Sequence, residues 1–400
     1  MGAYGGYETF VDKLTQYHQN NPQLKYHVAC KANGDGCMDE KKLEGVTDVR
    51  LADDGTVREF QYHNARCFKI SVPKIGAAQA VYYDLAALWE CCNYIETHRI
   101  PHPIVYIMAC RIGPFMGYFC RKIHKLGGKV YLNPDGHEWK RAKWNRFIRQ
   151  YWKLSEAMMV RQSDLVVCDS KNIEKYIHDT YDRGLKTGLS TTYIAYGAEI
   201  RGSEPAENTA AFTKWMEEKE LTPGGYYLIV GRFVPENNYE TMIREFMNSN
   251  TDRKLAVITN VNDKFLQQLE DKLHFRQDGR IQFVGTVYDQ QLLLKIRENA
   301  YAYLHGHEVG GTNPSLLEAM GATKLNLLLD VSFNREVAEE AALYWSKDRG
   351  NLASLLERCD SLNPEEIHSF GARAKNRIAG AYSWEFIAQQ YETLFTQKRL

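Results

Sequence analysis

Residues 302–321 read AYLHGHEVGGTNPSLLEAMG, and this stretch decides the fold class. The apolar run Ala302–Leu304 has the length of a buried strand, and the spacing predicts a helix over Pro314–Met320. Asn313 stands where a good N-cap belongs, and a proline fits the first helical position. A strand, a glycine-rich loop and a capped helix in this order are typical of an α/β protein built on parallel sheets.

The loop inside this stretch predicts an anion site. Gly310, Gly311 and Thr312 offer consecutive backbone amides, and the dipole of the helix capped by Asn313 adds positive potential, so we expect a phosphate here. Glu318 lies about one turn into the helix on the same face, where its carboxylate could accept hydrogen bonds from ribose hydroxyls. A solvated helix residue is the alternative, but the apolar neighbours of Glu318 favour a specific partner.

The same alternation of strands and helices runs through the rest of the chain. We predict strands at Tyr26–Cys30, Glu59–His63, Ile104–Met108, Lys129–Leu132, Leu165–Cys168, Thr192–Ala195, Tyr226–Val230, Leu255–Thr259, Ile281–Val284 and Leu325–Leu329. We predict helices at Thr9–Asn20, Ala77–His98, Phe115–Leu126, Trp144–Ser163, Thr241–Met247, Asp263–His274 and Tyr288–Asn299. The polar segment 202–223 separates two series, and two doubly wound domains leave a cleft at the carboxyl ends of their strands. The sequence therefore predicts two Rossmann-like domains facing a cleft, 1–200 and 201–380, and a helix at 381–400 that packs back toward the first.

Length and composition agree with this organisation. The 400 residues exceed what one hydrophobic core of about 250–300 residues accommodates. Hydrophobic residues at 44% and charged residues at 25% exclude disordered, collagen-like and coiled-coil chains. The net charge is zero, yet residues 101–150 hold ten basic and two acidic residues, which indicates an anionic partner at one face rather than a general nucleic-acid binder. The nine scattered cysteines favour buried free thiols over disulfides or a zinc site.

Two other segments suit a phosphate. Gly5 and Gly6 open a predicted helix, where backbone amides can approach an anion, although a simple tight turn is the alternative. A doubly wound domain should have a strand before this loop, so with Met1 so close we expect that first strand to be missing or the start to be misassigned. Arg232 follows a predicted strand directly and is placed to hold a diphosphate through two hydrogen bonds. The alternative for Arg232 is a surface pair with Glu236.

Ionisable residues also follow the predicted strand Lys129–Leu132. The segment NPDGHEW at 133–139 brings Asp135, His137 and Glu138 to the carboxyl end of that strand, which predicts a substrate site. For His137 taken alone, a structural role is the alternative.

The stretch 139–153 contains six basic residues, three tryptophans and no acid. Its candidate contact residues are Lys140, Arg141, Lys143, Trp144, Arg146 and Arg149. Basic residues with aromatic ones suit the interface of an anionic bilayer or a lipid head group. A plain helix with Trp144, Ile148 and Tyr151 turned inward is one alternative, and nucleic acid is another that the rest of the chain does not favour.

Several catalytic motifs are missing from the sequence. It contains no Gly-x-x-x-x-Gly-Lys-Ser/Thr phosphate loop, no Gly-x-Ser-x-Gly elbow, no His-Glu-x-x-His and no Asp-x-Asp. We therefore expect a two-domain enzyme that binds a diphosphate without a metal.

Taken in order, these motifs resemble the GT-B-fold glycosyltransferases of the large retaining family 4. The segments that carry the resemblance are YGGYETFV at 4–11, NPDGHEW at 133–139, GRFVPENN at 231–238, residues 307–320 and the tail YSWE at 382–385. Within this family the chain is most similar to bacterial rhamnosyltransferases that build capsule and cell-wall polysaccharides.

The resemblance implies an activity and a set of partners. Such enzymes take L-rhamnose from dTDP-L-rhamnose, with retention and without a metal or cofactor. They transfer it to a sugar on a polyprenyl diphosphate, here expected to be glucose in a β-1,4 linkage. The expected location is the cytoplasm, at the inner face of the cell membrane. In this reading Arg232 neutralises the leaving diphosphate, Glu318 holds the ribose, and Asp135, His137 and Glu138 orient the acceptor.

Two positions depart from the wider family. Gly310 replaces the first of two glutamates usually separated by seven residues, and Asn237, which we assign to the donor site, replaces a common lysine. Three alternatives stay open: a family 4 enzyme using a UDP- or GDP-sugar, a GT-B sugar-nucleotide epimerase, and a non-catalytic binding subunit. The basic tryptophan-rich stretch argues against the epimerase, which needs no acceptor site.

Overall fold

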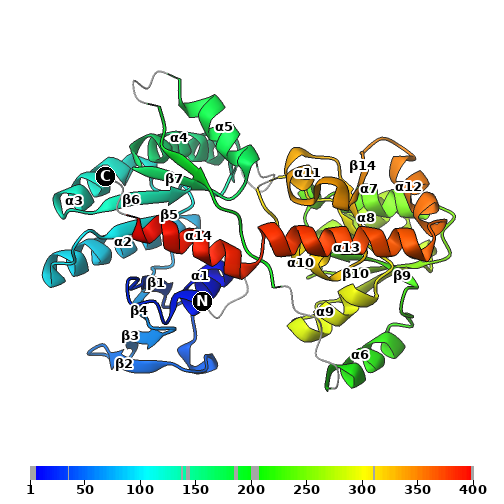
Figure 1. Ribbon diagram of the computed structural model, residues 1–400, viewed down its shortest axis with the longest axis horizontal. Coiled ribbons are helices and arrows are strands. Elements are labelled where there is room, and N and C mark those ends of the chain that lie inside the picture. Colours follow the sequence, from blue (N-terminus) through cyan, green and yellow to red (C-terminus); the bar gives the residue numbers. More distant parts are fainter. Residues whose placement is uncertain are drawn as a thin grey trace. The chain divides into compact units, whose positions relative to one another are not determined.

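The chain forms two compact α/β units, Met1–Gly197 with Trp384–Leu400, and Ala198–Ser383 (Figure 1). The computed structural model describes residues 6–34, 36–136, 138–140, 145–183, 188–199, 207–309 and 311–397. The first is called unit 1 and the second unit 2.

Unit 1 contains a parallel sheet whose strands follow one another in chain order. These are β5 (Ile104–Met108), β6 (Lys129–Asn133), β7 (Leu165–Cys168) and β8 (Thr191–Tyr193). Their connections are α3 (Gly113–Lys125), α4 (Arg146–Gln162) and α5 (Lys171–Tyr181), and α2 (Gln79–His98) precedes β5. Because right-handed connections in one direction place helices on one face, α3 packs between α2 and α4 over the sheet.

A second sheet in unit 1 differs from the expected all-parallel arrangement. Its order is β1 (His27–Lys31), β4 (Ala65–Ile70), β3 (Val57–Tyr62) and β2 (Thr47–Leu51), and only β1 and β4 run parallel. The predicted strand Glu59–His63 instead ends in a hairpin, because His63 and Asn64 both have positive φ, at 49° and 56°. Two such residues make the two-residue turn that matches the twist of antiparallel strands.

The C-terminal helix α14 (Trp384–Thr396) belongs to unit 1, where it lies beside α1 (Gly6–His18) (Figure 1). The ring of Phe10 packs 5.2 Å from that of Tyr391, and His18 Nε2 lies 2.9 Å from the carbonyl oxygen of Ala388. These contacts bury the apolar face of α1 against a segment almost 400 residues away in the chain.

Unit 2 is built on one parallel sheet. Its spatial order is β11 (Ile281–Gly285), β10 (Lys254–Ile258), β9 (Tyr226–Val230), β12 (Ala302–His305), β13 (Leu325–Leu329) and β14 (Leu343–Trp345). Its helices are α6 (Glu207–Glu218), α7 (Tyr239–Met247), α8 (Asp263–Leu273), α9 (Gln290–Asn299), α10 (Pro314–Ala322), α11 (Ser332–Ala338), α12 (Asn351–Asp360) and α13 (Pro364–Ala381). The strand order reverses between β9 and β12, and ligands of doubly wound sheets bind outside the carboxyl ends of the strands at such a point.

The cores consist of the apolar strands and the helix faces that cover them. All nine cysteines are free, and seven of them are buried. Among the described residues, none of the helices combines the length and the apolarity needed to cross a bilayer.

Candidate active site

The predicted donor residues of unit 2 gather where the strand order reverses. Arg232 follows β9 after one glycine and is exposed, and the loop that begins at Gly306 follows β12. The short 3-10 turn Pro235–Asn237 then leads into α7. The arginine and the glycine-rich loop therefore stand at the carboxyl ends of two adjacent strands.

Hydrogen bonds join these two loops. Asn237 pairs its Oδ1 with Nδ1 of His307 at 2.7 Å and donates from Nδ2 to the carbonyl oxygen of Arg232 at 2.8 Å. A Cβ on Gly306 would lie only 2.4 Å from the carbonyl oxygen of Asn237, so the approach of the loops requires a glycine there. Asn237, which the sequence predicts to bind the sugar donor, thus holds the backbone of Arg232 in place.

Asn238 is a second clamp that the sequence analysis missed. Its buried side chain donates to the carbonyl oxygen of Gly306 at 2.8 Å and to Oε2 of Glu308 at 3.0 Å. It adopts the left-handed conformation with φ 56°, which asparagine tolerates better than most residues. Glu308 also pairs with Lys347, which brings a cation to the edge of this loop.

The start of α10 has the predicted form. Asn313 caps the helix through Oδ1, which accepts from the amides of Ser315 and Leu316, and Pro314 occupies the first turn. Gly311 and Thr312 are buried directly before the cap. The amides of the first turn and the helix dipole provide an anion-binding end.

Glu318 has a partner inside unit 2. Its Oε2 lies 2.7 Å from Nη2 of Arg297, whose side chain is 4% exposed, whereas that of Glu318 is 35% exposed. The pairing explains how a carboxylate is tolerated on a mostly buried helix, and the ribose contact of Glu318 stays a prediction.

His305, at the end of β12, is a further group that the sequence analysis left without a role. Its ring is buried, Nδ1 lies 3.2 Å from the hydroxyl of Tyr303, and Nε2 has no hydrogen-bond partner among the described residues. Burial lowers the pKa of His305 well below its usual value, with the neighbouring His307 adding to the effect. The ring is therefore neutral, and its buried Nε2 is an unsatisfied polar atom at the end of β12.

The candidate acceptor residues of unit 1 lie at the carboxyl ends of its parallel strands. Asp135 follows β6 in the left-handed conformation with φ 65°, and its amide donates to Oδ1 of the buried Asn133 at 2.9 Å. Strained backbone of this kind persists where the surroundings hold it, often at functional sites.

Charged and phenolic groups from distant parts of the chain gather around Arg111, which also interacts with Asp135. Arg111, after β5, places Nη1 3.3 Å from both carboxylate oxygens of Asp84 on α2. Burial raises the pKa of Asp84 despite this cation. Burial also raises the pKa of Tyr7 on α1 well above its usual value, and the charge of Asp135 adds to the effect. No local pattern in the sequence indicates a role for Tyr7, Asp84 or Arg111, because their contacts depend on the fold.

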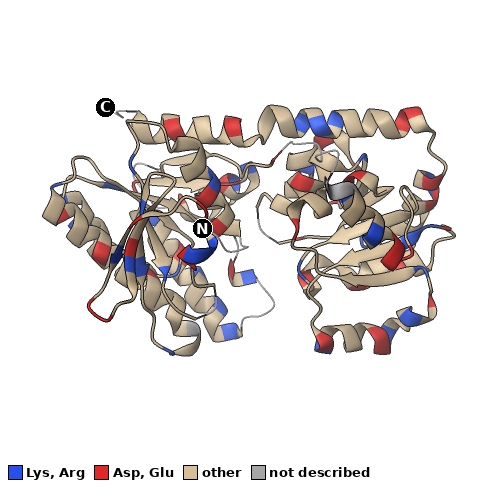
Figure 2. Ribbon diagram, turned by 90° about the horizontal axis from the view of Figure 1, so that it is seen from below, with Lys and Arg blue, Asp and Glu red and all other residues tan. Residues whose placement is uncertain are grey.

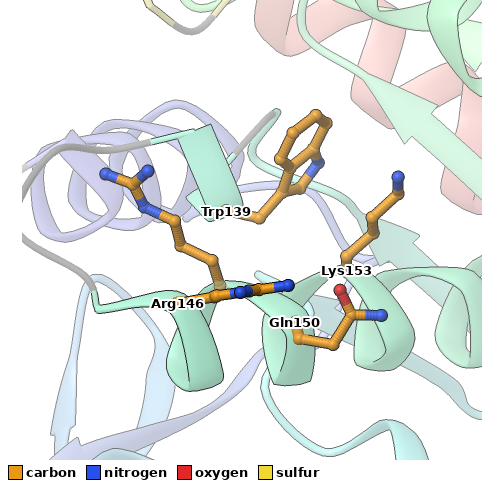
Figure 3. A pocket seen from close by; sticks show the side chains of 5 residues that line it. Trp139, Arg146, Gln150 and Lys153 are labelled. Atoms are coloured by element: carbon orange, nitrogen blue, oxygen red, sulfur yellow. The ribbon is translucent and has the colours of Figure 1, made fainter.

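The basic stretch forms a pocket of about 370 Å³ in unit 1 (Figure 3). Its lining residues are Trp139, Arg146, Arg149, Gln150 and Lys153. The ring centroid of Trp139 lies 5.3 Å from Nζ of Lys140 and 5.2 Å from Nζ of Lys153, and these cations favour an anionic ligand beside the ring. The structure thus brings Lys140, Arg146 and Arg149 together around Trp139. Their contact with a ligand stays a prediction.

The inner face of α4 agrees with the alternative expectation of a half-buried helix. Ile148 and Tyr151 are half-buried, and the Tyr151 hydroxyl donates to the carbonyl oxygen of Arg111 at 2.7 Å. The helix therefore packs on one side and lines the pocket on the other.

A buried network fixes the aromatic wall of the pocket. Trp139 Nε1 donates to the hydroxyl of Tyr176 at 3.2 Å, and Tyr176 and Tyr181 each donate to Oε1 of Glu156 at 2.5 Å. Glu156 is 2% exposed, and burial raises its pKa although both phenols counteract the rise.

The remaining predicted site residues either lie outside the described residues or are exposed or half-buried. Gly5, His137, Arg141, Lys143, Trp144 and Gly310 lie outside the described residues. Gly6 begins α1 and is exposed, and Glu138 is half-buried in the short turn Glu138–Lys140. Within the described ranges, no group of three or more His, Cys, Asp or Glu side chains is placed to hold a metal ion.

Comparisons with known proteins identify the fold. Residues 1–199 match a family model described as "Domain of unknown function (DUF1972)". A search of curated proteins gave no significant match.

Solved structures are similar over nearly the whole chain. They include Anabaena Alr3699/HepE in complex with UDP, at 13% identity, with 99% of this chain and 98% of that chain covered and a TM-score of 0.69. Sucrose-phosphate synthase from Thermosynechococcus elongatus has 14% identity, 98% and 93% coverage and a TM-score of 0.72. A glycosyltransferase from Rickettsia africae has 12% identity, 98% and 94% coverage and a TM-score of 0.72. The similarity to these structures confirms the predicted GT-B fold with two Rossmann-like domains.

Proposed function

We propose that this chain is a glycosyltransferase that binds a nucleotide sugar in unit 2 and transfers its hexose to an acceptor. The observation that carries the proposal is the hydrogen-bonded pair of loops after β9 and β12, together with the bond from Ser315 in the first turn of α10 to the carbonyl oxygen of Val230, two residues before Arg232. The GT-B fold supports it, and the similar HepE structure is described as a complex with UDP.

More specifically, we propose dTDP-L-rhamnose as donor and a sugar on a polyprenyl diphosphate as acceptor. The order of motifs along the whole chain supports a rhamnosyltransferase of capsule or cell-wall synthesis. The pocket around Trp139 supports an acceptor that carries phosphate, because three cations line it and no acid does. A lipid-linked acceptor would bring the enzyme to the inner face of the membrane.

In this mechanism the enzyme's main task is to stabilise the leaving diphosphate. Rhamnose is uncharged, so negative charge develops on the phosphate oxygen as the bond to the anomeric carbon breaks. Arg232 and the amides at the start of α10 oppose that charge, and fixed donors of this kind are usually the largest catalytic contribution. With retention, the departing phosphate oxygen accepts the proton of the attacking acceptor hydroxyl on the same face. Asp135 and Glu138 then orient the acceptor and need not act as strong bases.

A transfer assay over several donors tests this proposal. The full chain is incubated with dTDP-L-rhamnose, UDP-glucose or GDP-mannose and a polyprenyl-diphosphate glucose acceptor, in the presence of EDTA. We expect a rhamnosylated lipid only with the dTDP donor, with retained anomeric configuration by NMR, and its loss in Arg232→Ala but not in Arg276→Ala, an exposed arginine elsewhere in unit 2.

The other outcomes separate the alternatives. Product from UDP- or GDP-sugars alone keeps the transferase and overturns the rhamnose donor. Conversion of the nucleotide sugar without an acceptor indicates an epimerase, and donor binding without turnover indicates a binding subunit.

A further inference from the structure

Large aromatic side chains are exposed together on the helical layer of unit 1. Phe115 and Tyr118 on α3 are 47% and 48% exposed, and Trp89 on α2 is 49% exposed. The rings of Trp89 and Tyr118 lie 6.4 Å apart and nearly parallel, with an angle of 7°. Exposed aromatic residues gathered in this way point to an interaction surface.

The same face of α3 carries only basic charge. The helix sequence GPFMGYFCRKIHK contains no Asp or Glu, and Arg121, Lys122 and Lys125 follow the two aromatic residues. Lys122 lies seven residues after Phe115 and Lys125 seven after Tyr118, so these pairs share one side of the helix. Nζ of Lys122 lies 4.3 Å from the ring centroid of Trp89, which links the two helices.

The opposite side of α3 is buried, which fixes the orientation of the exposed face. Met116, Phe119 and Ile123 belong to the core under the sheet, and Gly113 allows close packing on Ser155 of α4. We call Trp89, Phe115, Tyr118, Arg121, Lys122 and Lys125 the α3 surface.

Of three acidic residues close to this face, Asp164, Glu90 and Glu96, two are engaged by other groups. Asp164 is engaged by His124 at 2.9 Å and by the amide of Val130 at 2.6 Å. Glu90 is half-buried near Arg66. Glu96 is exposed seven residues after Trp89, on the same side of α2, and leaves an excess of three basic residues over one acidic residue. By contrast, the charged residues of α14 are Glu385 and Glu392 alone, and the helix beside the C-terminus in Figure 2 is coloured red but not blue.

We infer that the α3 surface docks on an anionic lipid bilayer. Aromatic rings favour the membrane interface, and Lys and Arg are attracted to anionic head groups. On the neighbouring helix α4, Phe147 is also 86% exposed. The inference rests on the proposed function, since a lipid-linked acceptor must be reached at a membrane, and it adds α3 and Trp89 to the stretch predicted from the sequence.

Vesicle sedimentation with the full chain, without donor or acceptor, tests the inference. We expect binding to phosphatidylglycerol vesicles and little to phosphatidylcholine vesicles. The triple variant Arg121→Gln, Lys122→Gln, Lys125→Gln should bind roughly a hundredfold more weakly, at about 1 kcal/mol for each cation. The matched triple Lys264→Gln, Arg276→Gln, Lys324→Gln, with three exposed cations of unit 2, should bind like the wild type.

A second variant separates docking from simple charge attraction. Phe115→Ser with Tyr118→Ser keeps every charge and should still lose binding, and Trp89 fluorescence should be quenched by brominated lipids in the wild type but not in this variant. Circular dichroism shows whether each variant keeps its helices.

Three results would overturn the inference. They are wild-type binding in the α3 triple variant, equal losses in the two triples, or a wild-type chain that ignores anionic vesicles yet binds an acidic protein or RNA through α3. Transfer to a short-chain, water-soluble diphosphate acceptor should survive in the α3 variants. Loss of vesicle binding with intact transfer would thus separate this surface from the catalytic proposal.

Discussion

The candidate donor site of unit 2 and the candidate acceptor site of unit 1 are built in different ways. In unit 2, the side-chain amides of Asn237 and Asn238 form hydrogen bonds between two loops, and each loop directly follows a strand. In unit 1, Tyr7, Asp84 and Asp135 come from three separate segments, and each interacts with Arg111. The candidate donor site is therefore made from short local motifs, whereas the candidate acceptor site depends on contacts between distant segments.

The largest expected effect comes from the exposed arginine of the donor site. Arg232→Ala should lower kcat about 10²–10³-fold, because removal of one fixed donor to developing charge costs about 2.7–4 kcal/mol. Steady-state kinetics with dTDP-L-rhamnose measures it, with Arg276→Ala as control. A change in the KM for the acceptor alone would contradict the assignment of Arg232 to the donor site.

The next effect concerns the clamp between the loops. Asn238→Ala removes two donated hydrogen bonds and leaves a buried carbonyl unpaired, which should cost about 1–3 kcal/mol of unfolding free energy. The KM for the nucleotide sugar should rise as well. Asn250→Ala, which removes a solvent-exposed hydrogen bond to Glu357, is the control in denaturant unfolding. Equal losses in both variants would contradict a special role for the clamp.

A smaller effect is expected from the buried His305. The unfolded chain takes up a proton near pH 6.5, while burial keeps the folded ring neutral well below that pH. The unfolded state therefore binds more protons in acid, and the free energy of unfolding should fall by up to about 1.4 kcal/mol per pH unit below 6.5. Unfolding at pH 7.5, 6.5 and 5.5 should show a shallower decline in His305→Gln than in the wild type or in His368→Gln, an exposed histidine. An unchanged decline would refute the neutral buried ring.

The smallest effect should distinguish positioning from stability in unit 1. Tyr176→Phe and Tyr181→Phe each remove one hydrogen bond to Glu156, at about 0.5–1.5 kcal/mol, but only Tyr176 also holds Trp139. Tyr176→Phe should raise the acceptor KM several-fold with little change in kcat, and Tyr181→Phe should not. Equal kinetics in the two variants would reduce Glu156 and its phenols to a structural role.

The same difference explains what could be predicted from the sequence. The strands Ile104–Met108, Tyr226–Val230 and Leu325–Leu329 were found at their predicted bounds, because apolar runs flanked by turn residues are local signals. The cap of α10 was predicted for the same reason. The hairpin at His63 and Asn64 lacks the glycine that usually marks such a turn, so the antiparallel pairing of the predicted strand Glu59–His63 was not predicted.

The other contacts of the candidate sites could not be predicted because they join residues far apart in the sequence. Nothing near Arg111 in the sequence indicates that it pairs with Asp84, or that Tyr176 reaches Trp139. The role of Asn238 was not predicted because it depends on the close approach of the loop at Gly306. The spacing of residues within 231–238 does not indicate that approach.

Hydrogen–deuterium exchange of the full chain with and without dTDP-L-rhamnose tests the central claim most directly. We predict slower exchange in residues 231–238 and 305–318 of unit 2 when the donor is present. Further protection in residues 138–153 is expected only when the polyprenyl-diphosphate acceptor is added. Donor protection confined to unit 1, or no change in the two loops of unit 2 at saturating donor, would contradict the assignment of the nucleotide-sugar site.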